Sequence, residues 1–115
     1  MHITNSLNEH ELATGLVSLH LNVSVLALVS RRRDFRLIRA RMLYVWLLRE
    51  RASGLSYPVI GRWLGERNHS SIIHLHRLAL ELRTNDRQFR ALCEVAGEAF
   101  MRLQQAQQQE AGHDC

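Results

Sequence analysis

The sequence predicts an all-α protein, a small multi-helix domain, on three observations. Hydrophobic residues recur at helical spacing along most of the 115-residue chain. One proline and six glycines are too few for a turn-rich β architecture. Hydrophobic residues make up 46% of the chain and charged residues 23%, a composition that argues against a disordered chain. We expect one domain with a single core, because domains commonly have ~100–150 residues.

The N-terminal segment, residues 12–30, is expected to form two short helices. Part of it alternates apolar and polar side chains as a strand does, but its leucines follow the i, i+4, i+7 spacing of a helix. Asn22 is suited to end the first helix, and Ser24 to cap a second over residues 25–29. The leucines of the stripe are Leu12, Leu16 and Leu19.

A basic loop and a long helix are expected next. Residues 30–34, Ser-Arg-Arg-Arg-Asp, have no apolar side chain and predict the loop. An amphipathic helix is predicted over residues 35–51, ended by the Ala-Ser-Gly of residues 52–54. Tyr44 and Trp46 are expected in the core. The apolar stripe is Leu37, Ile38, Met42, Val45 and Leu48, with Arg39, Arg41 and Arg49 on other faces.

A short helix, a tight turn and a longer helix are predicted after it, which is the helix-turn-helix arrangement. Ser56 is the expected N-cap of the short helix, Pro58 fits its first turn, and Gly65 ends it. The longer helix is expected over about residues 70–83. Its buried stripe is Ile72, Leu75, Ala79 and Leu82, and its polar stripe is Ser70, His74 and Arg77. The arrangement alone does not establish DNA binding, because helix pairs also occur in proteins that bind nothing.

The C-terminal part is predicted to form a terminal helix from about residue 84. Its stripe is Phe89, Leu92, Cys93, Ala96, Phe100 and Leu103. Residues 104–115, mostly glutamine, are expected to fray. The predicted organisation is therefore one helix-turn-helix domain over residues 1–103 and a flexible Gln-rich tail over residues 104–115.

All 15 basic residues are arginine, and they are unevenly distributed. Residues 31–51 contain eight arginines against Asp34 and Glu50, a local charge of +6, whereas the whole chain carries +4. Such a cluster attracts polyanions, and the guanidinium fork suits phosphate and guanine. A GC-rich coding sequence is an alternative reason for the missing lysines, but it does not explain the clustering.

Other kinds of protein are not supported by the sequence. The N-terminus lacks the basic start of a secretory signal, and the longest apolar stretch, residues 16–29, is shorter than the ~20 residues of a membrane helix. Cys93 and Cys115 have unrelated settings, which favours a reducing cytosol over a disulfide framework.

Metal and catalytic sites are also not expected. His74 and His76 lie on different faces of their helix, so they do not form a zinc site with His69. His69 beside Ser70 and Ser71 is better explained by DNA reading than by catalysis. We expect no cofactor and no small-molecule substrate.

Residues 65–74, Gly-Glu-Arg-Asn-His-Ser-Ser-Ile-Ile-His, resemble a known signature. It is the Gly-x-Arg-Asp-His-Thr-Thr-Val-x-His of the C-terminal DNA-binding domain of DnaA, the bacterial replication initiator. The family's Ser-x-Pro-x-Ile-Gly helix, its basic loop and the arginines of its long helix have counterparts here. These are Ser56, Pro58, Ile60 and Gly61, residues 30–33, and Arg39 and Arg41. The resemblance extends to about Leu103 and implies the DnaA domain IV fold, which is Trp-repressor-like.

The resemblance also implies a DNA-binding role for individual residues. Arg33 would enter the minor groove, and Arg41 would contact a base edge or a phosphate. Base contacts in the major groove would come from Asn68, His69, Ser70 and Ser71. Residues near the phosphates would be Arg49, Ser56, Tyr57 and Pro58, with His74 and Arg77 reaching the backbone. Arg39 and Arg67 complete the expected DNA-binding set.

The chain departs from the family at residues that face DNA in this reading. Met42 stands where many members have glutamine, which removes a polar contact. Asn68 stands for an aspartate, which removes a charge and adds a donor. Ser70 and Ser71 stand for threonines and lack the methyl groups that pack against thymine.

The predicted function is sequence-specific binding of double-stranded DNA at DnaA-box-like sites, regulating replication initiation or transcription. The chain has no Gly-x-x-x-x-Gly-Lys-Ser/Thr loop, so ATP-driven unwinding is not expected. It would act in the cytoplasm, at the nucleoid, by competing with the initiator or regulating promoters. Met1 and the non-family tail favour a free-standing protein over a fragment of an initiator.

The alternative is a protein-interaction module without membrane association. Its Arg-rich face, or an apolar dimer surface in residues 16–29, would bind full-length DnaA or another replication or regulatory protein.

Overall fold

The computed structural model describes residues 8–113, with side chains for residues 8–108, and the elements in this range are all helices. In chain order they are α1 (Glu9–Leu21), α2 (Val25–Leu28), α3 (Phe35–Glu50), α4 (Tyr57–Trp63), α5 (His69–Asn85) and α6 (Arg87–His113). The predicted all-α class is confirmed. No helix in the described range is long and apolar enough to cross a membrane.

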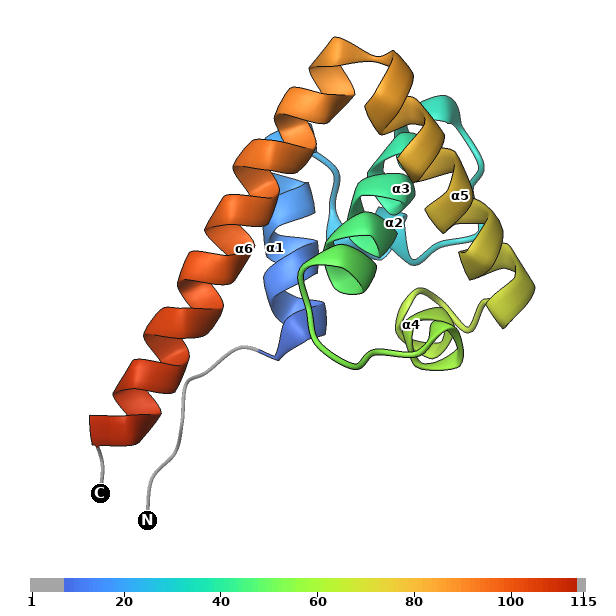
Figure 1. Ribbon diagram of the computed structural model, residues 1–115. Coiled ribbons are helices and arrows are strands. Elements are labelled where there is room, and N and C mark those ends of the chain that lie inside the picture. The colour runs from blue at the N-terminus through green and yellow to red at the C-terminus, as the bar shows by residue number, and fades with distance from the viewer. Residues whose placement is uncertain (1–7, 114–115) are drawn as a thin grey trace.

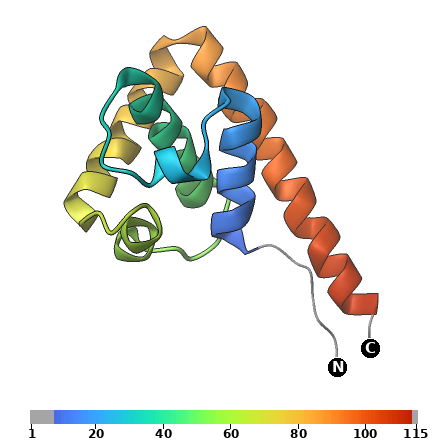
Figure 2. The same cartoon turned by 180° about the vertical axis from the view of Figure 1, so that it is seen from behind.

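Helix α3 lies at the centre of the molecule (Figure 1). It contacts α1, α2, α5 and α6, whereas α4 packs against α5. Helix α6 runs along α1, and its C-terminal end projects past the start of α1 (Figure 1). Figure 2 shows the opposite side, where α2 and the loop after it lead to the start of α3.

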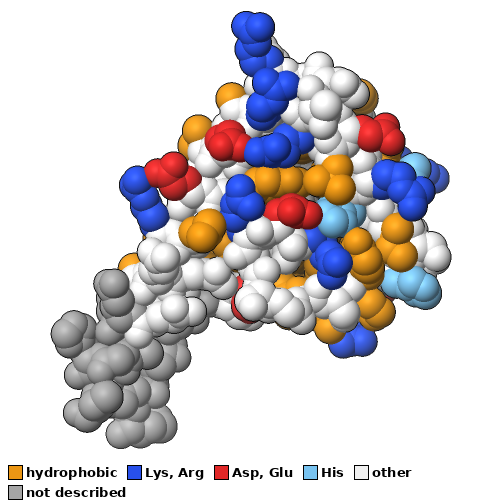
Figure 3. Space-filling view, in the orientation of Figure 1, with side chains coloured by type: hydrophobic (Ala, Val, Ile, Leu, Met, Phe, Trp, Pro, Cys, Tyr) orange, Lys and Arg blue, Asp and Glu red, His pale blue; other side chains and the backbone are white. Residues whose placement is uncertain are grey.

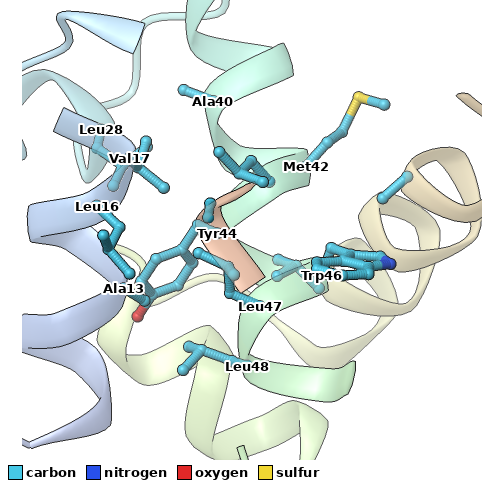
Figure 4. Close-up of a cluster of buried hydrophobic side chains, with 14 of the residues drawn as sticks. Ala13, Leu16, Val17, Leu28, Ala40, Met42, Tyr44, Trp46, Leu47 and Leu48 are labelled. Carbon is cyan, nitrogen blue, oxygen red and sulfur yellow. The ribbon is translucent and has the colours of Figure 1, made fainter. Parts of the chain in front are cut away.

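The core is built around α3, which is buried on all sides over residues 40–48. Figure 4 shows how the α3 side chains meet α1 and α2. The prediction of an amphipathic α3 is therefore wrong over this stretch, because neighbouring helices cover every face. Tyr44 and Trp46 are buried as predicted, at 0% and 2% exposure.

The first helices begin and end at cap residues, of which Asn22 and Ser24 were predicted. Asn22 ends α1 in the left-handed conformation, with φ 53°, and the Ser24 hydroxyl accepts a hydrogen bond from Ala27 N–H to begin α2. Asp34 likewise accepts from Leu37 N–H to begin α3. The two short helices predicted for residues 12–30 are confirmed.

The C-terminal region differs from the prediction in two ways. Helix α5 continues to Asn85, so α6 begins at Arg87 and not at residue 84, with Asp86 accepting from the N–H groups of Gln88 and Phe89. Residues 104–113, expected to fray, instead continue α6 to His113. Glutamine and alanine are good helix formers, which accounts for the extension. Residues 114–115 lie outside the described range.

Candidate nucleic-acid interface

The turn between α4 and α5 is tight because two glycines allow close backbone contacts. A Cβ on Gly61 would lie 2.1 Å from the Arg67 carbonyl oxygen, and Arg67 N–H donates to Gly61 O at 2.8 Å. Gly65 has φ +77°, and a Cβ there would lie 2.2 Å from Val29 O. Ser56 caps α4 and Pro58 lies in its first turn, as predicted. These contacts fix the angle at which α5 leaves the turn.

The N-terminal half of α5 presents an exposed polar face, here called the recognition surface. Its members are Asn68, His69, Ser70, Ser71, His74 and Arg77, all exposed. Asn68 is the N-cap, and its side chain accepts a hydrogen bond from Ser71 N–H at 2.9 Å. Helix α5 therefore begins at His69, one residue before the predicted start. The polar stripe predicted for this helix is on its surface, while Ile72 and Ala79 of the other stripe are buried.

The basic loop, residues 30–34, exposes Arg31, Arg32 and Arg33. Arg32 forms an ion pair with Asp34 at 2.8 Å. The amide hydrogen bond from Leu37, followed by Arg32, lowers the pKa of Asp34. Arg32 is therefore paired with the acidic residue at the end of the loop. Arg33 has no such partner among the interactions of the described residues.

Arg41 lies beneath the basic loop and not on the surface, at 3% exposure. Its guanidinium donates to Leu28 O at 2.8 Å, to Arg32 O at 2.6 Å, and to two further carbonyl oxygens, of Ala27 and Ser30. Burial, followed by the nearby charge of Arg67, lowers its pKa to about 10, so it remains protonated at neutral pH. In this conformation Arg41 holds the loop backbone with its donors, a setting that differs from the exposed position expected for a residue that contacts DNA.

Arg67 joins the basic loop to the turn. It donates from one guanidinium nitrogen to Leu64 O and from the other to Ser30 O at 2.8 Å. Burial lowers its pKa, as do the charges of Arg31 and Arg33. The loop and the turn before α5 are thus connected by one side chain, although they are more than 30 residues apart in the sequence.

A side-chain network supports the start of α4. Arg49 donates to Leu55 O at 2.8 Å, and its guanidinium lies 3.9 Å from the centre of the Tyr57 ring. The Tyr57 hydroxyl is 2.9 Å from His76 Nδ1, and His76 Nε2 is 2.8 Å from a carboxylate oxygen of Glu50. Sequence reasoning missed His76 and Glu50 as parts of this region, because nothing local indicates that they meet Tyr57.

Arg39 lies apart from the recognition surface. Its guanidinium stacks over Phe89 of α6 at 5.4 Å, and it borders an apolar groove between α3 and the C-terminal half of α5. The structure therefore brings together the basic loop, the turn, the recognition surface and the start of α4, but places Arg39 outside this group. Figure 3 shows arginine and histidine side chains gathered at the right-hand edge, over the N-terminal half of α5.

The remaining histidines and cysteines were considered as ligands of a metal site. No three His, Cys, Asp or Glu side chains lie together as metal ligands there. His74 is exposed, while His76 is buried at 9% exposure, so the two do point in different directions. Cys93 is a buried free thiol, with a pKa raised by burial to about 12, and Cys115 lies outside the described range.

The part of the chain that contains this interface is similar to known proteins. A family described as the bacterial dnaA protein helix-turn-helix matches residues 11–78. The match ends within α5, short of the Leu103 to which the resemblance was expected to extend. No solved structure matches the chain.

The curated relatives include proteins named chromosomal replication initiator protein DnaA. The one from Nitrosomonas europaea is 32% identical over 80 residues, which covers 66% of this chain and 17% of the relative. The one from Rhizobium johnstonii is 35% identical over 71 residues, which covers 62% of this chain and 14% of the relative. The chain thus spans less than a fifth of the length of these relatives.

Proposed function

Because the chain belongs to the family of bacterial DnaA helix-turn-helix domains, whose fold binds DNA, we propose that it binds double-stranded DNA sequence-specifically at DnaA-box-like sites. Helix α5 enters the major groove with its N-terminal residues, and the basic loop enters the adjacent minor groove. The protein regulates replication initiation or transcription in this way, without an ATPase activity of its own. It acts in the cytoplasm, at the nucleoid.

The observation that supports this function best is the connection between the loop and the turn. Arg67 bonds to Ser30 O in the basic loop and to Leu64 O at the end of α4. Two elements that contact different grooves must keep a fixed spacing, because the grooves themselves have a fixed spacing. A rigid connection supplies that spacing before DNA binds, which lowers the ordering cost of binding.

The residues of the interface divide into groups with different tasks. Arg33 inserts into the minor groove, where narrow A·T tracts concentrate negative potential. Asn68, His69, Ser70 and Ser71 contact base edges. Arg41 and Arg67 position the loop from beneath. Phosphate-facing residues are Arg49, Ser56, Tyr57, Pro58, His74 and Arg77. Arg39 is left out of this proposal because it stacks over Phe89 of α6.

A specific observation also favours the second candidate, a protein-interaction module. Leu19 and Leu26, in the apolar segment of residues 16–29, are 75% and 81% exposed. Exposed leucines of this kind occur at surfaces that bind other proteins. In this second function the partner is full-length DnaA or another replication or regulatory protein. Binding such a partner is compatible with binding DNA.

Selection of binding sites from a random duplex library tests the proposed function. Enrichment of a DnaA-box-like motif supports competition with the initiator at its own sites. Enrichment of a different motif indicates an independent regulator. If no sequence is enriched, the proposal of sequence-specific binding is wrong, and the protein-interaction module becomes the better account.

A further inference from the structure

The side chain of Asn68 has a fixed orientation at the start of α5. Its carboxamide oxygen, Oδ1, accepts the hydrogen bond from Ser71 N–H at 2.9 Å. A backbone N–H is only a donor, so it must be met by the oxygen and not by the amide nitrogen. The nitrogen, Nδ2, therefore faces away from the helix end. Asn68 is exposed, and no hydrogen bond among the described residues uses Nδ2.

The backbone on both sides of Asn68 is held as well. Arg67 N–H donates to Gly61 O, and the Arg67 side chain is bonded to two carbonyl oxygens. On the other side, Asn68 O accepts from Ile72 N–H as the first turn of α5. The direction of the two Nδ2 hydrogens is therefore set before DNA arrives, which is the condition for a selective contact.

From this geometry we propose that Asn68 is a specificity-determining residue that donates from Nδ2 to an acceptor on a base edge, which guanine, thymine and adenine all present, and disfavours cytosine. The proposal rests on the proposed function, since it concerns which base pairs the recognition surface selects. It assigns a base class to one position of the binding site.

The choice of base follows from the groups in the major groove. Guanine presents O6 and N7 and thymine presents O4, all acceptors, whereas the polar group of cytosine there is the N4 donor. Asparagine usually reads adenine with its oxygen and nitrogen together. Adenine N7 is an acceptor for Nδ2, and Oδ1 keeps a second lone pair beside the cap to Ser71, so adenine is not disfavoured. Cytosine is the base whose major-groove edge offers Nδ2 no acceptor.

The neighbouring residues do not supply the same discrimination. The hydroxyls of Ser70 and Ser71 both donate and accept, so each can bond to any of the four bases. The role of the His69 nitrogens depends on the tautomer. Among the first four residues of the recognition surface, Asn68 is therefore the one whose outward group has a single fixed polarity.

The substitution Asn68→Asp tests the inference directly. Aspartate caps helices as well as asparagine does, so α5 should start at the same residue. The outward group changes from an NH₂ donor to a carboxylate acceptor of nearly the same shape. The matched control is Asn68→Ser, whose hydroxyl keeps the cap but whose shorter side chain lacks the outward NH₂ group.

The experiment selects sites from a random duplex library with each protein and then measures Kd for four duplexes that differ at one base pair. We expect wild type to bind each of the other three duplexes about tenfold more tightly than the cytosine duplex, the effect of about one hydrogen bond. Asn68→Asp should reverse this ranking in favour of cytosine, and Asn68→Ser should abolish it. The ranking is the readout because the added charge weakens all four complexes alike.

Two results would overturn the inference, and they differ. If all three proteins select one motif with the same base ranking at every position, DNA reading stands and the role of Asn68 is wrong. If wild type selects no motif, the proposed function fails and the inference fails with it. Thermal unfolding of the three proteins shows whether each variant is folded, and a variant that is unfolded is replaced by Asn68→Thr, which also caps.

Discussion

His69, the first residue of α5, is exposed beside the cap residue Asn68. Replacing His69 with alanine removes a polar group from the recognition surface and leaves the cap in place. We expect His69→Ala to cost about 1–3 kcal/mol on the selected duplex and little on a random duplex. Titrations of both duplexes at one salt concentration measure the difference.

The matched control for this prediction is His74→Ala, five residues further along α5 on the recognition surface. His74 is assigned to the phosphate backbone, which carries no sequence information, so its loss should weaken both complexes equally. If His69→Ala also weakened both equally, His69 would have no part in base reading.

His10 connects α1 to the core at a position where its protonation affects stability. Its Nδ1 lies 2.7 Å from the hydroxyl of Tyr44, which is fully buried. Burial raises the pKa of Tyr44 above its usual range, so the hydroxyl keeps its proton at neutral pH. The tautomer of His10 decides which of the two groups donates. Burial also lowers the pKa of His10, although Glu11 opposes the shift.

The lowered pKa of His10 predicts a loss of stability on acidification. The unfolded chain binds the proton near pH 6.5, before the folded protein does, so protonation favours unfolding. Above pH 6.5 the full contribution of His10 is present, and it decreases as the pH falls towards the lowered folded value. We expect the melting temperature of wild type to fall more between pH 7.5 and pH 5 than that of His10→Gln. Parallel curves for the two proteins would exclude a role for His10.

At the scale of elements, the basic loop depends on Arg41, which donates to four of the backbone carbonyls around it. Arg41→Gln leaves most of these acceptors without a donor, so we expect it to lower the free energy of unfolding by about 2–4 kcal/mol. Urea denaturation measures this. Arg41→Lys keeps the charge but cannot spread its donors over four acceptors, so its loss should be intermediate.

A positioning role for Arg41 also has a signature in DNA affinity. If Arg41 acts by holding Arg33 in place, Arg41→Gln should cost little further affinity once Arg33 is alanine. Kd values for wild type, both single variants and the double variant form the cycle that measures this coupling. Additive losses would mean that Arg41 contacts DNA itself, as the resemblance implied.

The basic loop should also respond to the base composition beside the binding site. Arg33 is exposed, and a minor groove narrowed by A·T pairs attracts arginine. We expect Arg33→Ala to weaken binding most on duplexes with an A·T-rich flank. Arg32→Ala is the control, because Arg32 is already paired with Asp34. If Arg33→Ala lowered the affinity equally with and without an A·T-rich flank, minor-groove insertion by Arg33 would be contradicted.

The elements could be predicted from the sequence because their boundaries depend on neighbouring residues. Asn22 and Ser24 separate α1 from α2, and Ser56 with Pro58 begins α4, through contacts within about three residues. The end of α6 was missed because the glutamine-rich segment has helical propensity but no stop signal.

The positions of the arginines could not be predicted in the same way. Arg41 and Arg39 both lie on α3, yet one is beneath the basic loop and the other stacks on Phe89. The carbonyls that Arg41 meets are 9 to 14 residues away, and they converge only when the loop has folded over α3. The contact of His76 with Tyr57 and Glu50 likewise needs three elements in place.

At the scale of the whole molecule, the arginines that face one surface determine how it responds to salt. Arg31, Arg33 and Arg77 are exposed on the basic loop and α5, whereas Arg32 is paired with Asp34. If each of the three neutralises one phosphate, the slope of log affinity against log salt is about −2.7, at about −0.9 for each phosphate. The slope is measured by titrating one duplex at several salt concentrations. The slope depends on the number of phosphates that the protein neutralises and not on which bases it contacts.

Two variants separate this surface from the rest of the protein. Arg77→Gln should make the slope shallower by about 0.9, because binding then neutralises one phosphate fewer and releases fewer counterions. Arg102→Gln should leave the slope unchanged, since Arg102 lies on α6 and pairs with Glu98. A salt-independent complex, or equal effects of the two variants, would contradict phosphate neutralisation by the loop and α5. It would also leave the arginine-rich surface to an acidic protein partner, because a DNA complex must release the counterions that its cations displace.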